Sequence, residues 1–268
     1  MPNSETPASP RILYGKSGGA ATLTISQPSK LNAMTFEMWS SLADSVREAE
    51  ADPDIRVIVL RGDGTRAFCA GADISQFGAM RDSDDAVASY EKAVSAGTAA
   101  LANACKPTVA AISGICFGGG FGLSMCCDLR IAATDSRYRI PAARLGLGYA
   151  FSGVELIAKK IGISQTADLL MSARIIDAKE AGAIGILNAV FDAATFAQES
   201  ENYIRRIAAN APITLRAAKA ALNEIVKPVA ARDVSKVDAL VAACFKSEDY
   251  REGRAAFAEK REPNFKGY

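Results

Sequence analysis

The stretch ICFGGGFGLSMCCDLR, residues 115–130, has three consecutive glycines directly before an apolar segment of helical character. Free N–H groups and the positive end of the helix dipole meet at a helix N-terminus. Glycines in the preceding turn let a ligand approach the backbone closely. The stretch therefore predicts a turn whose amides bind a negatively charged or polarised group.

A second turn of the same kind lies earlier in the chain, in AFCAGADIS at residues 67–75. Each turn follows a buried strand, IRVIVLRG at 55–62 or TVAAISG at 108–114, and each precedes a helical segment. Loops held between such elements often carry binding and catalytic groups. Two turns in this order favour a shared ligand over tight backbone packing without a ligand.

Phosphate is one candidate ligand, but the nucleotide-binding motifs are absent. The chain has no GxxxxGK[ST] sequence, and GxGxxG fails on spacing because the sixth residue is Leu123 counted from Gly118 and Met125 counted from Gly120. The other candidate is a thioester or similar carbonyl oxygen that accepts one N–H from each turn. Such an oxyanion hole stabilises a transition state by about 3–4 kcal/mol per donor.

The composition is that of a globular protein without a polyanionic partner. The chain has 268 residues, of which 49% are hydrophobic, and its 31 basic and 30 acidic residues give a net charge of +1. We therefore expect no binding to nucleic acid. No run of about 20 apolar residues is present, so we expect no membrane insertion. Residues 1–10 are polar and unlike a secretory signal, which predicts a disordered lead-in and a cytoplasmic location.

The chain contains no histidine and six cysteines without a CxxC pair. Nucleophilic sites built on Ser-His-Asp or Cys-His and zinc sites of the HExxH type are therefore excluded. The cysteines fit buried free thiols in a reducing compartment better than disulfides or metal ligands. We expect no metal, and acid–base chemistry is left to Asp, Glu, Tyr, Cys, Lys or water.

The order of predicted elements indicates an α/β fold in one continuous domain. Strands are expected at 20–26, 55–62, 108–114 and 128–134, and a helix capped by Thr35 is expected over 36–52. Strand–turn–helix units fill the first two-thirds of the chain, and the pattern becomes mostly helical from about Ser164.

Several segments together resemble the crotonase (enoyl-CoA hydratase/isomerase) superfamily. They are FCAGADIS, AAISGICFGGGFGLSMCCDLRIA, PAARLGLG, DAKEAGAIGILNAVF and the C-terminal SEDYREGRAAFAEKREPNFKGY, and the resemblance covers nearly the whole chain after residue 11. It implies a crotonase (ClpP-like) spiral of ββα units over residues 11–200. It also implies a helical trimerisation region over 201–268, a homotrimer or dimer of trimers, and an acyl-CoA substrate. No separate cofactor is expected, because coenzyme A enters as part of the substrate.

The same resemblance implies a set of site residues. The backbone amides of Ala72 and Gly119 would form the oxyanion hole. Residues expected to contact the CoA or acyl part of the substrate are Lys30, Leu31, Ala70, Asp73, Ile74, Pro141 and Arg144, with Phe265 and Lys266 supplied by a neighbouring subunit. Lys30 is one position away from the lysine of many hydratases, so a solvated surface charge is an equal alternative. For Asp73, capping of a helix start is an alternative.

Hydratases of this superfamily use two glutamates to position and activate water, and this chain lacks both. The matching positions are Gly122, three residues after Gly119, and Ala142, directly after Pro141. Glycine and alanine have no proton to transfer, so hydration by the glutamate route is chemically unavailable. Isomerases with a single glutamate rely on the second position and are disfavoured for the same reason.

Tyr149 is the candidate that remains near the thioester. Methylmalonyl-CoA decarboxylases of this superfamily have a tyrosine at the matching place, and their C-terminal sequence is similar to this tail. Decarboxylation suits a site without carboxylates, because a glutamate would repel the leaving carboxylate. Tyr149 would orient that carboxylate or deliver a proton, and Arg144 or Arg139 would attract it. This chain departs from those decarboxylases at Ala72, where they have histidine, and at Gly122, where they have glutamate.

Three alternatives accompany this hypothesis. Tyr149 is also interpretable as an aromatic side chain that only fills the pocket wall. Hydration would need another acid such as Glu155, although the spacing of Glu155 and Lys159 favours a surface ion pair. A chain that kept the pocket and lost the acids would be a non-catalytic acyl-CoA-binding protein.

Overall fold

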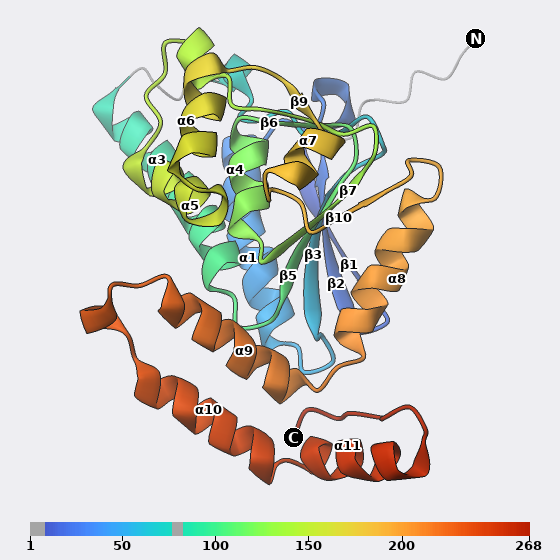
Figure 1. Cartoon of the computed structure of the whole chain (residues 1–268). Helices are drawn as coiled ribbons and strands as arrows, with labels where there is room; N and C mark the ends of the chain where they lie inside the picture. Colours follow the sequence, from blue (N-terminus) through green and yellow to red (C-terminus); the bar gives the residue numbers. More distant parts are fainter. Residues whose placement is uncertain (1–8, 77–82) are drawn as a thin grey trace.

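The computed structural model describes residues 9–76 and 83–268 of the chain (Figure 1). Most of the expected lead-in, residues 1–8, therefore lies outside the described residues. Two sheets and a set of surrounding helices make up the part of the chain that the structure describes.

The larger sheet has six strands in the order β1-β2-β3-β5-β7-β10. These strands are β1 (Arg11–Ser17), β2 (Ala20–Ser26), β3 (Val57–Gly62), β5 (Thr108–Ile112), β7 (Leu129–Ala133) and β10 (Ala189–Phe191). β1 is antiparallel to β2, and every other neighbouring pair in this sheet is parallel. The strands expected at 20–26, 55–62, 108–114 and 128–134 are confirmed as β2, β3, β5 and β7.

The smaller sheet has four strands in the order β4-β6-β8-β9. These are β4 (Ala67–Cys69), β6 (Ile115–Phe117), β8 (Arg137–Arg139) and β9 (Ile176–Asp177). β4, β6 and β8 run parallel to one another, and β9 pairs antiparallel with β8.

Helices lie between and after these strands along the described chain. They are α1 (Phe36–Ala51), α3 (Asp84–Asn103), α4 (Gly119–Cys126), α5 (Phe151–Ile161), α6 (Ile163–Ser172), α7 (Ala178–Ala183), α8 (Phe196–Ala208), α9 (Pro212–Ile225), α10 (Val234–Lys246) and α11 (Glu248–Glu259). The short 3-10 helices are η1 (Pro28–Lys30), η2 (Ile74–Gln76), η3 (Ala142–Arg144) and η4 (Val229–Ala231). The expected cap of α1 is confirmed, because Thr35 Oγ1 accepts a hydrogen bond of 3.3 Å from the Met38 amide.

The path of the chain repeats three times. The pairs β3–β4, β5–β6 and β7–β8 each place their first strand in the larger sheet and their second strand in the smaller one. A helix then follows each pair, namely α3, α4 and α5. This repeat is the expected spiral of ββα units, and it brings the ends of β4 and β6 side by side at the start of α4.

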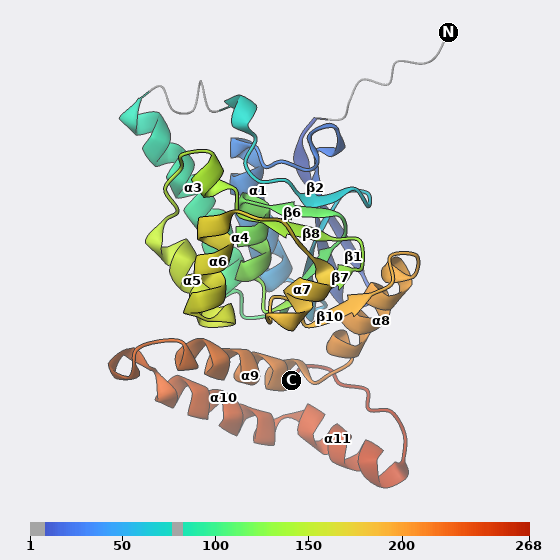
Figure 2. The same cartoon turned by 45° about the horizontal axis from the view of Figure 1, so that its top comes forward.

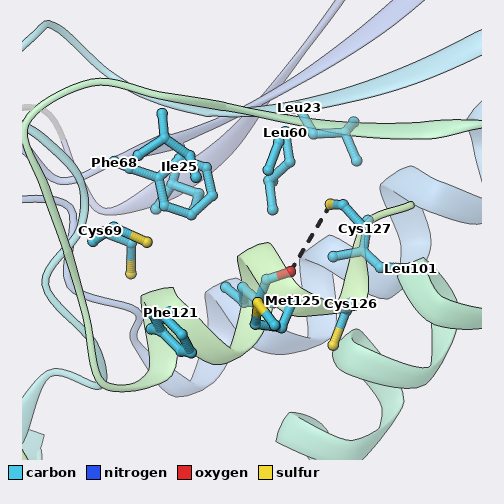
Figure 3. Close-up of a cluster of buried hydrophobic side chains, with 14 of the residues drawn as sticks. Leu23, Ile25, Leu60, Phe68, Cys69, Leu101, Phe121, Met125, Cys126 and Cys127 are labelled. Atoms are coloured by element: carbon cyan, nitrogen blue, oxygen red, sulfur yellow. Dashed lines mark hydrogen bonds between the residues drawn. The ribbon is translucent and has the colours of Figure 1, made fainter. Parts of the chain in front are cut away.

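Two apolar cores hold the layers together. The larger one lies between the sheets and α1, α3 and α4, and Figure 3 shows Phe121 and Met125 of α4 gathered there with Leu60 and Phe68 from the strands. The smaller one packs α8 against the opposite face of the larger sheet, through Phe196 and neighbours on β3, β5 and β7. Central strands buried on both faces read as continuous apolar runs, which is the pattern of VIVL in β3.

The last three helices, α9, α10 and α11, lie together beside the two-sheet body (Figures 1 and 2). Buried Lys219 of α9 joins them to it by an ion pair of 2.8 Å to Asp128. An apolar groove of about 810 Å³ lies between these helices, and Phe245 and Phe257 on its walls are 63% and 87% exposed. The expected division of the chain at 200/201 falls inside α8, which packs on the sheet. Across the described residues, no helix is both long and apolar enough to cross a membrane.

Candidate active site

The two glycine-containing turns meet at the ends of β4 and β6. A Cβ atom built on Gly119 would lie 3.5 Å from the amide nitrogen of Ala72, and one built on Gly71 would lie 3.4 Å from the amide nitrogen of Gly119. Gly71 and Gly118 have φ angles of +113° and +50°, a region that L side chains rarely adopt. Glycine is therefore required on both sides of the contact, and the structure brings the Ala72 and Gly119 amides together.

Hydrogen bonds next to these two amides fix their orientation. The Met34 amide donates to the Gly71 carbonyl at 2.7 Å, and the Asp73 amide donates to the Met34 carbonyl at 2.9 Å. On the other turn, the Gly118 amide donates to the Arg139 carbonyl at 2.9 Å. Among residues 9–76 and 83–268, no acceptor is recorded for the Ala72 or Gly119 amide. The two donors are therefore held in place and left available for a shared oxygen, as an oxyanion hole requires.

Tyr149 lies against the first turn of α4, directly before α5. A Cβ atom on Gly122 would lie 3.3 Å from its hydroxyl oxygen, and a Cβ atom on Gly153 would lie 2.7 Å from its Cε1. The phenol thus occupies the space in which a side chain at 122 would begin. Glycine at 153 makes room for the ring. The structure therefore places Tyr149 beside Gly122, the position that the resemblance matches to the first hydratase glutamate.

The Tyr149 hydroxyl is a neutral donor in this position. Burial raises the pKa of Tyr149 to about 12, and the nearby thiols of Cys126 and Cys116 contribute further. The side chain therefore keeps its proton at neutral pH. In the described part of the chain, no hydrogen-bond partner is recorded for its oxygen, so the hydroxyl is free to bond a substrate atom.

Asp73 and Lys30 form an ion pair beside the first turn. Lys30 Nζ lies 2.8 Å from Asp73 Oδ2 and 2.6 Å from the Ser75 hydroxyl. Burial alone would raise the pKa of Asp73, but the hydrogen bonds from Lys30 and Ser75 outweigh it and hold that pKa below its usual value. The Ser75 amide also donates to Asp73 at 3.1 Å, so Asp73 caps η2 as its alternative interpretation predicts. Lys30 is therefore held by Asp73 and Ser75 rather than left as a free surface charge.

We expect Asp73→Asn to lower the free energy of unfolding by about 1–2 kcal/mol at pH 7, because the variant removes a buried charge that Lys30 and Ser75 stabilise. The pKa of Asp73 is lower in the folded state than in the unfolded state. The stabilisation by its charge is therefore fully present at pH values above the unfolded-state pKa, and it is lost as the pH falls through the folded-state pKa. Urea unfolding at pH 7 and at a pH low enough to protonate Asp73 in the folded state measures both values. Asp44→Asn, which breaks an exposed pair with Arg47, is the control and should change stability little. An equal difference at both pH values would contradict the assignment.

The other residues expected to contact CoA or the acyl group differ in their surroundings. Leu31 accepts a hydrogen bond of 3.0 Å from Ala70 through its carbonyl, and Ile74 is 66% exposed beside it. Pro141 packs 3.6 Å from a Cβ position on Gly118. Arg144 is exposed on η3.

Phe265 and Lys266 lie on the C-terminal tail, which folds back on α11. The Phe265 ring packs on Gly253, and the Lys266 amide donates to Asp249 at 2.6 Å. Nothing in the described chain brings them to the two turns of the same subunit, and their expected contact with a neighbouring subunit stays a prediction.

Glu155 and the thiols do not fit the role of catalyst in this arrangement. Glu155 is about half exposed and lies 3.1 Å from Lys159, so the expected i,i+4 ion pair is confirmed. Cys69 and Cys116 are fully buried, and burial raises the pKa of Cys69 to about 12. Both thiols therefore stay protonated and fill the core. No group of three or more His, Cys, Asp or Glu side chains in the described chain is placed to hold a metal ion.

Sequence reasoning missed two features of this region. The two glycines that accommodate Tyr149 come from different helices, and nothing in the sequence marked Gly122 or Gly153 as space for its ring. Arg130 and Lys160, which bind carbonyls at the far end of α4, gave no motif at all.

Comparisons with known proteins agree with this geometry. The sequence model of the family described as enoyl-CoA hydratase/isomerase matches residues 15–268. A crotonyl-CoA hydratase from Syntrophomonas wolfei is 32% identical over 95% of this chain and 97% of its own length. A short-chain-enoyl-CoA hydratase from Clostridium acetobutylicum is 29% identical over 93% of this chain and 95% of its own length.

Among solved structures, an enoyl-CoA hydratase/carnithine racemase from Magnetospirillum magneticum superposes with a TM-score of 0.89 at 32% identity, covering 96% of both chains. The family match, the relatives and the ββα spiral lead to one conclusion. The chain belongs to the enoyl-CoA hydratase/isomerase family and is an acyl-CoA enzyme with the crotonase fold.

Proposed function

We propose that this enzyme stabilises a thioester enolate with the Ala72 and Gly119 amides and acts on it as a carboxyacyl-CoA decarboxylase. The observation that carries the proposal is the Tyr149 hydroxyl. It takes the space beside Gly122, is protonated, and has no recorded partner in the described chain. A neutral hydroxyl beside the reacting carbon can donate a hydrogen bond to the substrate carboxylate, whereas a glutamate there would repel that carboxylate.

The reaction balances without a cofactor. The bond between the α-carbon and the carboxylate breaks, CO2 leaves, and the electron pair moves onto the thioester oxygen as an enolate. The two amides stabilise that oxygen because they are oriented before the charge develops. The α-carbon then takes a proton from Tyr149 or from water, and a Tyr149 that has given its proton recovers it from solvent.

Hydration is the second candidate, because the curated relatives are named as hydratases. In this chain Gly122 and Ala142 supply no carboxylate, so hydration would need another acid. Glu155 is the acid that the sequence suggests, and it would first have to leave its ion pair with Lys159.

Purified protein incubated in parallel with crotonyl-CoA and methylmalonyl-CoA separates these functions. We expect CO2 release from methylmalonyl-CoA and little water addition to crotonyl-CoA. Glu155→Gln should leave CO2 release unchanged, because its side chain has no part in the enolate chemistry. Water addition that Glu155→Gln abolishes would replace the decarboxylase proposal with the hydratase. Tight CoA binding without turnover of either substrate would favour a binding protein.

The site is proposed to be completed by self-association into a homotrimer or a dimer of trimers. The exposed apolar side chains of α9–α11 and their groove support an interface between copies. In such an assembly Phe265 and Lys266 of one subunit would contact the CoA bound to another. Light scattering on the full chain measures the oligomeric state.

A further inference from the structure

The C-terminal end of α4 has a feature that the chemistry above does not use. Two cationic side chains bind its last carbonyls. Arg130 Nη1 donates to the Cys127 carbonyl at 2.7 Å and to the Ser124 carbonyl at 3.4 Å, and Lys160 Nζ donates to the Cys127 carbonyl at 3.3 Å. Figure 3 shows the same helix end, where the Cys127 thiol donates to the Leu123 carbonyl.

These cations have no carboxylate partner in the part of the chain that the structure describes. No carboxylate oxygen there lies within 4.0 Å of either side chain. The nearby Asp128 carboxylate is instead held by Lys219 and by the Thr108 amide and hydroxyl. Arg130 is 4% exposed, and burial lowers the pKa of both Arg130 and Lys160. Burying unpaired positive charge is costly, so a balancing interaction is expected at this site.

The helix itself provides part of that interaction, together with the Ile186 carbonyl, which accepts from Arg130 Nε at 2.6 Å, and the attraction of the nearby Asp128 carboxylate. A helix has partial negative charge at its C-terminus and partial positive charge at its N-terminus, and cations stabilise the former. α4 has eight residues, so its ends are only about 12 Å apart. The amide of Gly119 at its N-terminus is one of the two donors of the oxyanion hole. Positive charge at the far end therefore also makes the potential at Gly119 more positive.

α5 connects both ends of this arrangement. Near its start, Gly153 accommodates the Tyr149 ring beside Gly122, and near its end Lys160 reaches Cys127. α5 therefore runs in the same direction as α4, bonds the C-terminal end of α4 through Lys160, and packs on the Tyr149 ring that lies beside the first turn of α4. Lys160 is placed to fix the position of α4 along its axis.

We propose that Arg130 and Lys160 are positioning residues of the oxyanion hole, which hold α4 by its C-terminal carbonyls and strengthen the positive potential at the Gly119 amide. This inference rests on the proposed oxyanion hole. It is independent of whether the enolate arises by decarboxylation or by hydration. Lys160 is the better test residue because its side chain is only partly buried, whereas Arg130 is almost fully buried.

The test uses sorboyl-CoA as a probe, because the ultraviolet absorption of a conjugated thioester moves to longer wavelength when its carbonyl is polarised. We expect a red shift on binding to the wild type, a smaller shift with Lys160→Met, and recovery with Lys160→Arg, which keeps the charge. With the substrate that turns over, kcat should fall about 3- to 10-fold in Lys160→Met while KM changes little. Lys179→Met, which removes an exposed lysine on α7, is the matched control.

The outcomes separate this inference from the proposed function. A wild-type protein that binds sorboyl-CoA without a red shift would overturn the oxyanion hole and this inference with it. An equal red shift in wild type and Lys160→Met would overturn this inference alone. A reduced shift that Lys160→Arg does not restore would mean that Lys160 acts by packing, which contradicts a role for its charge. Thermal unfolding of each variant ensures that folded proteins are compared.

Discussion

Tyr149→Phe is expected to lower CO2 release from methylmalonyl-CoA by about 100-fold or more, the usual contribution of a positioned acid. The variant keeps the ring that packs on Gly153 and removes only the hydroxyl beside Gly122. The KM should change less than kcat, because the proposed contacts with CoA lie elsewhere. Steady-state rates of wild type and variant measure the effect. Because the pKa of Tyr149 is about 12, the wild-type rate should not fall through loss of this proton below about pH 10.

Tyr203→Phe is the matched control for this prediction. Tyr203 lies on α8, on the other face of the larger sheet, and its ring packs edge-on against Phe191 of β10, so loss of its hydroxyl should leave the rate unchanged. Gly153→Ala approaches the same question from the other side. Its new methyl group would lie 2.7 Å from Cε1 of Tyr149 and would displace the ring. Full activity in both Tyr149→Phe and Gly153→Ala would leave Tyr149 as a filler of the pocket wall.

Gly120→Ala is expected to be the most destabilising single methyl group in the site. A Cβ atom there would lie 2.3 Å from the Cys69 carbonyl oxygen and 2.7 Å from Cys69 Cβ, at the end of β4. Neither neighbour is a flexible chain end, so α4 must move away from β4. We expect a loss of about 3 kcal/mol or more in the free energy of unfolding, together with loss of activity because the Ala72 and Gly119 amides separate. Chemical denaturation and activity assays measure the two effects.

Gly122→Ala is the control for stability, because it is the same substitution two residues further along the same helix. The nearest atom to its new methyl group would be the Tyr149 hydroxyl at 3.3 Å, the far end of a side chain that needs to shift by only a few tenths of an ångström. Alanine also has the higher helix propensity by about 1 kcal/mol. Its stability should therefore equal or exceed that of the wild type. Equal stabilities for Gly120→Ala and Gly122→Ala would contradict the close approach of β4 and α4.

Much of the fold followed from local patterns. The continuous apolar runs of β3 and β5 indicate strands buried on both faces, and Thr35 before an apolar period of 3.6 indicates the start of α1. The two glycine turns were also visible, because glycine is needed where φ is positive and where backbones approach closely. What the pattern lacked was the division of strands between two sheets. That division depends on pairings between strands far apart in the chain, such as β4 with β6.

The site was predictable only in its backbone part. The meeting of Gly71 with Gly119 follows from a motif, whereas the position of Tyr149 depends on empty space at Gly122 and Gly153. Empty space has no sequence signature of its own. The contacts of Arg130 and Lys160 at the end of α4 could not be predicted for a similar reason. Both side chains bind backbone carbonyls, which every residue carries.

The contact between Tyr149 and Gly122 also bears on how mutation could connect this chain with the hydratases that the resemblance describes as having a glutamate at position 122. A tyrosine at 149 needs glycine at 153 to fit, and a Cβ atom at 122 already lies 3.3 Å from the phenol oxygen, so a side chain as long as glutamate at 122 would compete with the phenol for space. Neither arrangement is then reached from the other by one change without passing through a poorly packed pocket. The effects of substitutions at these three positions should therefore depend strongly on one another, and an ancestor common to both arrangements must have changed them together or in a permissive order.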